Sequence, residues 1–108
     1  MSYEIRVSLR FKKELKSLRK KYKKIDKDLE NLKKELLVNP TAGTPLGDNL
    51  YKIRLSNSSI PTGKRGGFRI ITFVKIEKET IILLTIYAKT EKENISDEEL
   101  KEILNSLG

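Results

Sequence analysis

Alternating and periodic apolar positions organise the first forty residues. Tyr3, Ile5 and Val7 fall on one side of a short segment, which predicts a half-buried strand. Ser8 can cap the following helix, and a second helix ends before Asn39-Pro40 because the residue preceding a proline disfavours helical backbone. The apolar positions at helical spacing are Phe11, Leu15, Leu18 and Tyr22 in the first helix, and Ile25, Leu29, Leu32 and Leu36 in the second. This part of the chain therefore predicts a strand followed by an antiparallel helical hairpin.

The second half of the chain predicts three strands and a final short helix. Residues 50–55, 68–76 and 80–88 are rich in Ile, Leu, Thr, Phe and Val, as strands are, and a charged turn at 77–79 joins the last two. The segments 41–49 (TAGTPLGDN) and 56–67 (SNSSIPTGKRGG) have the composition of connections and are predicted to be loops. Ser96-Asp97-Glu98-Glu99 is a capping box that predicts the start of the last helix.

These elements follow the order β-α-α-β-β-β-α, which indicates an α+β fold. Three consecutive strands most simply form an antiparallel meander, the N-terminal strand joins that sheet, and the helical hairpin packs across one face. The chain has 108 residues without an internal repeat or an inter-domain linker, so we expect a single domain over residues 1–108.

Composition excludes several kinds of chemistry. The chain has no Cys, which excludes disulfides, thiolate zinc sites and a thiol nucleophile. It has no His, the usual acid–base residue near neutral pH and the commonest transition-metal ligand. We therefore expect no metal and no cofactor, with any catalysis carried by Lys, Arg, Tyr, carboxylates or hydroxyls. The longest apolar run, Ile81–Leu84, is too short for a membrane span or a signal peptide, so we expect a cytoplasmic protein with no membrane partner.

The charge balance favours a polyanionic partner. Lys and Arg number 23 against 15 Asp and Glu, which gives a formal charge of +8, and the sequence pI is about 9.7. Nucleic acid is the commonest partner of so basic a chain, and an acidic protein surface would serve as well. Residues 1–40 hold 13 basic and 6 acidic side chains, whereas residues 96–108 hold 1 and 4. This distribution predicts a positive face and an acidic terminal helix.

The segment Gly63–Arg69 (GKRGGFR) concentrates three cations and three glycines in seven residues. Glycines permit close backbone approach, and Lys and Arg side chains contact phosphates, so the segment could hold a phosphodiester. The alternative is a hairpin loop that its charges keep soluble.

Lys52 and Arg54 share one face of their predicted strand because strand side chains alternate. If the strand that begins at Phe68 pairs with it, Arg69 comes alongside them. Three cations on one sheet face repel one another unless an anion binds there. The alternative is the solvent-facing side of an antiparallel sheet.

Two further stretches carry candidate residues. The most apolar strand ends in Tyr87, Lys89 and Glu91, a phenol, an ammonium and a carboxylate that could transfer protons, with Lys92 just beyond. The alternative is a strand end followed by a charged loop. The first helices also contain a lysine-rich run, which is either a solvated face or a surface that tracks phosphates. Its members are Lys20, Lys21, Lys23 and Lys24.

Taken together, these motifs resemble the RelE/ParE toxin superfamily of type II toxin–antitoxin modules, and most closely its HigB-like or phage Gp49-like branch. The resemblance covers nearly the whole chain. It rests on the strand and helical hairpin at the start, Asn39-Pro40-x-x-Gly43, Leu50–Arg54 (LYKIR), Gly63–Arg69 and Leu83–Glu91 (LLTIYAKTE).

The resemblance implies a RelE-like fold and a ribosome-dependent mRNA endoribonuclease that inhibits translation. Such enzymes use the 2′-hydroxyl of the substrate as the nucleophile and leave a 2′,3′-cyclic phosphate and a 5′-hydroxyl, without a metal ion. The partners implied are a cognate antitoxin protein, the ribosome and mRNA. Two alternatives stay open: a ParE-like DNA gyrase poison, and a non-catalytic RNA- or ribosome-binding module.

The resemblance also implies roles for individual residues. Catalytic candidates are Lys52 and Arg54 (the basic pair of the second family strand), Arg69 (scissile phosphate), Lys89 (basic strand end) and Tyr87 (base stacking or proton donation). RNA- or ribosome-binding candidates are Lys64, Arg65, Lys92 and the lysines 20, 21, 23 and 24. Thr90 and Ser96 stand where classical RelE has an arginine and a tyrosine. Either the roles of those two residues move to Lys89, Lys92 and Tyr87, or the acid–base assignment differs.

Overall fold

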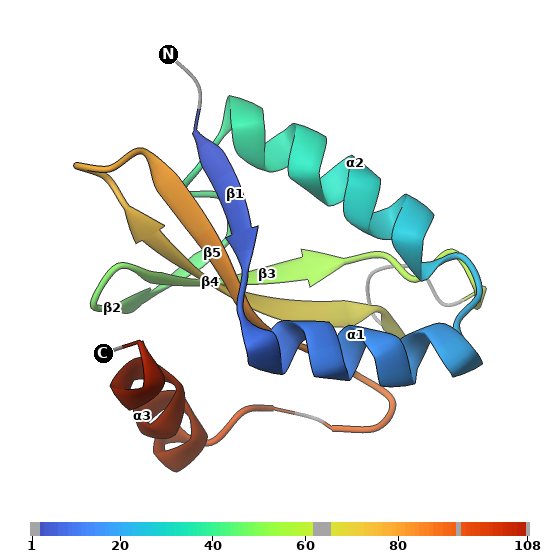
Figure 1. Ribbon diagram of the computed structural model, residues 1–108. Coiled ribbons are helices and arrows are strands. Elements are labelled where there is room, and N and C mark those ends of the chain that lie inside the picture. Colours follow the sequence, from blue (N-terminus) through green and yellow to red (C-terminus); the bar gives the residue numbers. More distant parts are fainter. Residues whose placement is uncertain (1–2, 62–65, 93, 108) are drawn as a thin grey trace.

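A computed structural model describes residues 3–61, 66–92 and 94–107. Five strands form one sheet in the order β1-β5-β4-β3-β2, and three helices lie against it (Figure 1). The elements are β1 (Glu4–Val7), α1 (Leu9–Lys21), α2 (Ile25–Val38), β2 (Thr44–Gly47), β3 (Leu50–Leu55), β4 (Phe68–Lys75), β5 (Thr80–Ala88) and α3 (Asp97–Ser106). The predicted α+β class is confirmed.

The predicted meander is also confirmed, and the sheet as a whole is mixed. β3 pairs antiparallel with β4, and β4 pairs antiparallel with β5. β1 joins the outer edge of β5 in parallel, with Glu4 opposite Thr80 and Val7 opposite Leu83. A parallel partner requires a crossover rather than a hairpin, and the chain between β1 and β5 provides it.

The prediction of a loop over residues 41–49 was wrong, because this segment contains β2. Thr44 pairs with Lys52 of β3, and Asp48 and Asn49 make the two-residue turn with φ of +53° and +63°. Positive φ at both central residues is typical of the tight turns that join hairpin strands, and Asp and Asn tolerate it. All four residues of β2 are exposed, so its turn and backbone pairing form the strand without any buried side chain.

The helical hairpin packs on one face of the sheet, as predicted. Phe11 of α1 and Ile25 of α2 are at most 1% exposed and meet Phe68, Ile70 and other sheet residues in a first core. Ser8 caps α1 by accepting a hydrogen bond from the Phe11 amide at 3.0 Å. The periodicity of the sequence therefore identified both helices and the faces that they bury.

A second core lies on the opposite face, beneath α3. Leu50, Ile71 and Leu84 of the sheet pack there with Ile103 of α3. Lys52 and Arg54 follow Leu50 at alternating positions of β3, so they project from this same face. Arg54 is exposed, so α3 leaves this end of the face open. Within the described residues, no helix is long and apolar enough to cross a bilayer.

Candidate active site

The strand register brings the predicted cationic residues together. Arg54 of β3 lies opposite Arg69 of β4, and Arg69 lies opposite Tyr87 of β5. Residues paired directly across a sheet project from the same face, and Lys52 joins them by alternation. The predicted approach of Arg69 to Lys52 and Arg54 is confirmed. We call the four cations Lys52, Arg54, Arg69 and Lys89 the cationic face.

Burial and mutual repulsion set the electrostatics of this face. Arg69 is only 4% exposed, and its guanidinium donates a hydrogen bond to the Phe68 carbonyl at 3.1 Å. Burial and the nearby Arg54 charge lower the pKa of Arg69. Burial also lowers the pKa of Lys52, and the charges of Lys89, Arg69 and Arg54 lower it further.

Lys52 and Arg54 are without carboxylate partners in the part of the chain that the structure describes. Seven ion pairs are formed there, and neither residue takes part in one. Lys52 instead donates a hydrogen bond to the neutral side chain of Asn94 at 2.9 Å. Cations held close together with so little compensation favour the binding of an anion with several oxygens, such as a phosphate.

Tyr87 is less accessible than its place in the sequence suggested. Its side chain belongs to the second core and is 7% exposed. Burial raises the pKa of this hydroxyl, while the Arg69 charge opposes the shift. Ile95 packs in the same core, and the Lys92 ammonium lies 5.6 Å from the centre of the Tyr87 ring. Base stacking or proton donation by Tyr87 therefore requires these neighbours to move.

Comparison with known proteins decides the family. Residues 9–106 match the family model of the RelE toxin of the RelE/RelB toxin–antitoxin system. The chain belongs to the RelE toxin family. The resemblance in the sequence is thereby confirmed at the level of the superfamily, and the HigB-like branch stays a prediction. As a member of this family, the chain is a type II toxin.

Solved structures of RelE share the fold of this toxin. A free E. coli RelE mutant in which two arginines are replaced by alanine is 23% identical to this chain in sequence. The match covers 86% of this chain and 90% of that chain, with a TM-score of 0.59. The isolated E. coli RelE toxin is 21% identical, with coverage of 98% and 99% and a TM-score of 0.58. RelE from the intact E. coli RelBE toxin–antitoxin complex is 25% identical, with coverage of 78% and 93% and a TM-score of 0.56.

The predicted binding residues of the toxin fall in three places. Lys64 and Arg65 lie outside the described residues. The four lysines of the helical hairpin lie at its turn: Lys20 and Lys21 end α1, and Lys23 and Lys24 precede α2. All four are exposed. Lys92 lies in the connection between β5 and α3, beside Tyr87.

The turn of the helical hairpin contacts the connections that flank the cationic face. Lys21 pairs with Glu91, three residues after β5, at 3.5 Å. The backbone amide of Lys24 donates to the Ser59 hydroxyl, in the connection between β3 and β4, at 3.0 Å. The lysine-rich turn is therefore connected to the cationic end of the sheet, where a long polyanion could contact both.

An ion-pair network that the sequence did not reveal secures α3. Glu99 accepts hydrogen bonds from Lys92 and from Arg10 of α1, the latter at 3.0 Å. Arg10 also pairs with Glu14 of the same helix, at 3.4 Å. Lys92 is thus engaged with a carboxylate as well as with the Tyr87 ring. Arg10, Lys92 and Glu99 lie on three separate segments, so no local spacing in the sequence could have connected these three residues.

A prediction for stability follows from Glu99. The hydrogen bond from Lys92 is the largest cause that lowers the pKa of Glu99, and Arg10 adds to it. A carboxylate with a lowered folded-state pKa stabilises the fold above its ordinary pKa and loses this contribution as the pH falls through the lowered value. Glu99→Gln should therefore reduce the free energy of unfolding by about 0.5 kcal/mol at pH 7. Urea unfolding at pH 7 and pH 3 measures this, and the difference from wild type should shrink at pH 3.

The control for this prediction is Glu98→Gln, which makes the same charge change at an exposed neighbouring position of α3. It should leave stability nearly unchanged at both pH values. Equal effects of the two substitutions would show that the network contributes nothing specific.

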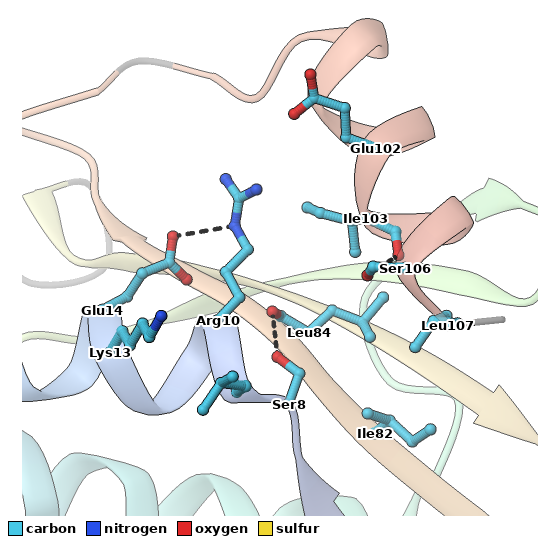
Figure 2. A pocket seen from close by; sticks show the side chains of 11 residues that line it. Ser8, Arg10, Lys13, Glu14, Ile82, Leu84, Glu102, Ile103, Ser106 and Leu107 are labelled. Carbon is cyan, nitrogen blue, oxygen red and sulfur yellow. Dashed lines mark hydrogen bonds and ion pairs between the residues drawn. The ribbon is translucent and has the colours of Figure 1, made fainter.

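An open groove of about 950 Å³ lies between the start of α1, β5 and α3 (Figure 2). Leu9, Leu84 and Leu107 contribute apolar surface to it, and Arg10 and Glu14 form an ion pair along one side. None of the residues that line it belongs to the cationic face. In the described chain, no cluster of acidic residues has the arrangement of a metal site.

Proposed function

We propose that this toxin is a cytoplasmic, ribosome-dependent mRNA endoribonuclease that inhibits translation. The observation that supports this best is the cationic face, where adjacent strands hold Lys52, Arg54 and Arg69 on one surface. A gyrase poison acting through protein contacts has no need of a half-buried lysine among arginines. A phosphodiester under attack gains negative charge that such a face would stabilise.

The proposed reaction is an attack of the ribose 2′-hydroxyl on the adjacent phosphorus. A bond forms between O2′ and phosphorus, and the bond between phosphorus and O5′ breaks. A general base accepts the proton of the 2′-hydroxyl, and a general acid gives a proton to the leaving O5′. The products are a 2′,3′-cyclic phosphate and a 5′-hydroxyl, so no water molecule is consumed.

The four side chains of the cationic face suit the roles that this reaction needs. The lowered pKa of Lys52 makes its neutral, proton-accepting form more accessible near pH 7, so we assign Lys52 as the base. Arg69 and Arg54 present guanidinium groups, which donate to two phosphate oxygens at once. Lys89 follows the end of β5, and its positive charge lowers the pKa of Lys52. Its ammonium is therefore our candidate for the general acid.

The identity of the nucleophile can be tested with a modified substrate. The purified toxin is incubated with an mRNA held on ribosomes, and the cut is mapped. A second mRNA carries a single 2′-deoxynucleotide on the 5′ side of that cut, and a third carries it three nucleotides away. We expect cyclic phosphate and 5′-hydroxyl ends from the first and third, and no cut at the mapped position in the second. Cleavage of the second mRNA at an unchanged rate, or 5′-phosphate ends, would contradict the mechanism.

A further inference from the structure

The side chain of Asn94 holds the ammonium of Lys52. The Lys52 Nζ donates to Asn94 Oδ1 at 2.9 Å, and the backbone amide of Ile95 donates to the same oxygen at 3.1 Å. Two donors converge on this atom, so it is the carbonyl oxygen of the amide and not its nitrogen. The backbone contact fixes the direction of that oxygen. Lys52 and Asn94 are 42 residues apart in the sequence, so the fold alone brings them together.

The segment that presents Asn94 is well anchored. Ile95 is 7% exposed and packs in the second core with Tyr87. Ser96 caps α3 by accepting a hydrogen bond from the Glu99 amide at 3.1 Å. Asn94 therefore sits next to a buried side chain and three residues before Asp97, the first residue of α3. Asn94 itself is exposed, and its oxygen is held by its contacts with Lys52 and with the Ile95 amide.

A neutral acceptor at position 94 affects the protonation of Lys52 differently from a charged one. Within residues 3–61, 66–92 and 94–107, the charged groups that bear on Lys52 are Lys89, Arg69 and Arg54, and all three are cations that disfavour the ammonium form. A carboxylate at the position of Asn94 would stabilise the ammonium and oppose them. An amide carbonyl accepts an N–H from either form of the lysine, so it orients the amine without adding a negative charge.

We infer that Asn94 is a positioning residue for proton transfer, whose carbonyl oxygen orients the Lys52 amine toward a substrate bound at the cationic face. When the amine is neutral, one of its N–H groups is held by Asn94, and its lone pair is then directed away from that bond. The lone pair can receive the proton of the 2′-hydroxyl, which leaves lysine as an ammonium. The inference rests on the proposed function, since it concerns the base of that reaction.

The test uses two substitutions and two measurements. Asn94→Asp introduces a negative charge beside Lys52, and Asn94→Ala removes the acceptor without adding a charge. NMR titration of the ¹⁵N-labelled lysines in the toxin gives the pKa of Lys52 without any substrate. Single-turnover cleavage of ribosome-bound mRNA between pH 5 and pH 9 gives the pH profile of the reaction.

We expect Asn94→Asp to raise the pKa of Lys52 by about 1 unit or more, and to move the rising limb of the pH profile upward by the same amount. The cleavage rate near pH 7 should then fall about 10-fold and recover at higher pH. Asn94→Ala should instead lower the rate by a similar factor at every pH. The control Asn31→Asp makes the same change on the exposed surface of α2 and should alter neither measurement.

The outcomes separate the inference from the function on which it rests. An unchanged Lys52 pKa in Asn94→Asp, with the fold intact by circular dichroism, would overturn the contact. A raised pKa with an unchanged pH profile would show that Lys52 is not the base that Asn94 serves, and would overturn the inference while leaving the nuclease in place. Absence of cleavage by the wild-type toxin would overturn the proposed function itself, and the role of Asn94 with it.

Discussion

Arg69→Ala is expected to reduce the rate of mRNA cleavage by about 10²- to 10³-fold, which corresponds to a loss of about 2.7–4 kcal/mol of transition-state stabilisation in comparable oxyanion sites. Arg69 is the central member of the row that joins β3, β4 and β5, with Arg54 on one side and Tyr87 on the other. It is held in a fixed orientation by burial and by its bond to the Phe68 carbonyl. Because Arg69 is buried, the side chains that cover its guanidinium must move, as for Tyr87, before it contacts the phosphate directly. Single-turnover cleavage of mRNA on ribosomes measures the loss.

Two further variants make the Arg69 result specific. Arg6→Ala removes an arginine from β1, where the side chain is exposed and paired with Glu4 at 3.1 Å, and it should cleave at the wild-type rate. Arg69→Lys keeps the charge but loses the bidentate hydrogen-bond donor geometry of the guanidinium. Its cleavage rate should therefore lie between those of the wild type and Arg69→Ala. A folded Arg69→Ala variant that cleaves within two-fold of the wild type would remove Arg69 from the site.

Gly67→Ala is expected to destabilise the fold by about 2–3 kcal/mol. A Cβ at this position would lie 2.1 Å from the Leu55 carbonyl oxygen and 3.2 Å from the Ser56 Cα, both of which are backbone atoms. Leu55 pairs with Phe68 at the start of the β3–β4 ladder, so relief of the clash must disturb that pairing. The melting temperature should fall by roughly 8 °C or more. Thermal unfolding followed by circular dichroism checks this.

Gly47→Ala provides the comparison for the Gly67 result. Gly47 has a φ of +91° and no neighbouring atom within 4 Å of the added Cβ. Its substitution therefore costs only the backbone strain of a positive φ, about 1 kcal/mol. If Gly67→Ala is no more destabilising than Gly47→Ala, then the close approach of the β3 backbone to residue 67 is not the reason for glycine at that position.

The sequence predicted the elements that bury apolar side chains, on one face in the helices and on both faces in β4 and β5. Phe11 and Ile25 lie on periodic apolar faces, and these faces are buried as expected. β2 was not predicted because its four residues are all exposed, so the sequence has no pattern of buried apolar positions there. Its pairing depends on the Asp48-Asn49 turn, whose residue types also occur in ordinary loops.

The part of the candidate site that lies on the strands was predictable, because it follows from side-chain alternation and strand pairing. Lys52 and Arg54 share a face by alternation, and pairing between adjacent strands brings Arg69 beside them. The contacts of Asn94 with Lys52 and of Glu99 with Arg10 were missed because they join distant segments. The capping box placed Glu99 at the start of α3 but gave no sign of its contact with Arg10. The burial of Tyr87 was missed for a related reason, since it depends on where the segment after β5 packs.

The central claim is that the toxin cuts mRNA on the ribosome with its cationic face. The most direct test incubates the purified wild-type toxin and its Arg69→Ala and Arg6→Ala variants with one mRNA, free and bound to translating ribosomes. We expect cuts only in the ribosome-bound mRNA, made by the wild type and Arg6→Ala and lost in Arg69→Ala. Equal cutting of free mRNA, equal cutting by Arg69→Ala, or no cutting by folded wild-type toxin together with inhibition of DNA gyrase would contradict the claim.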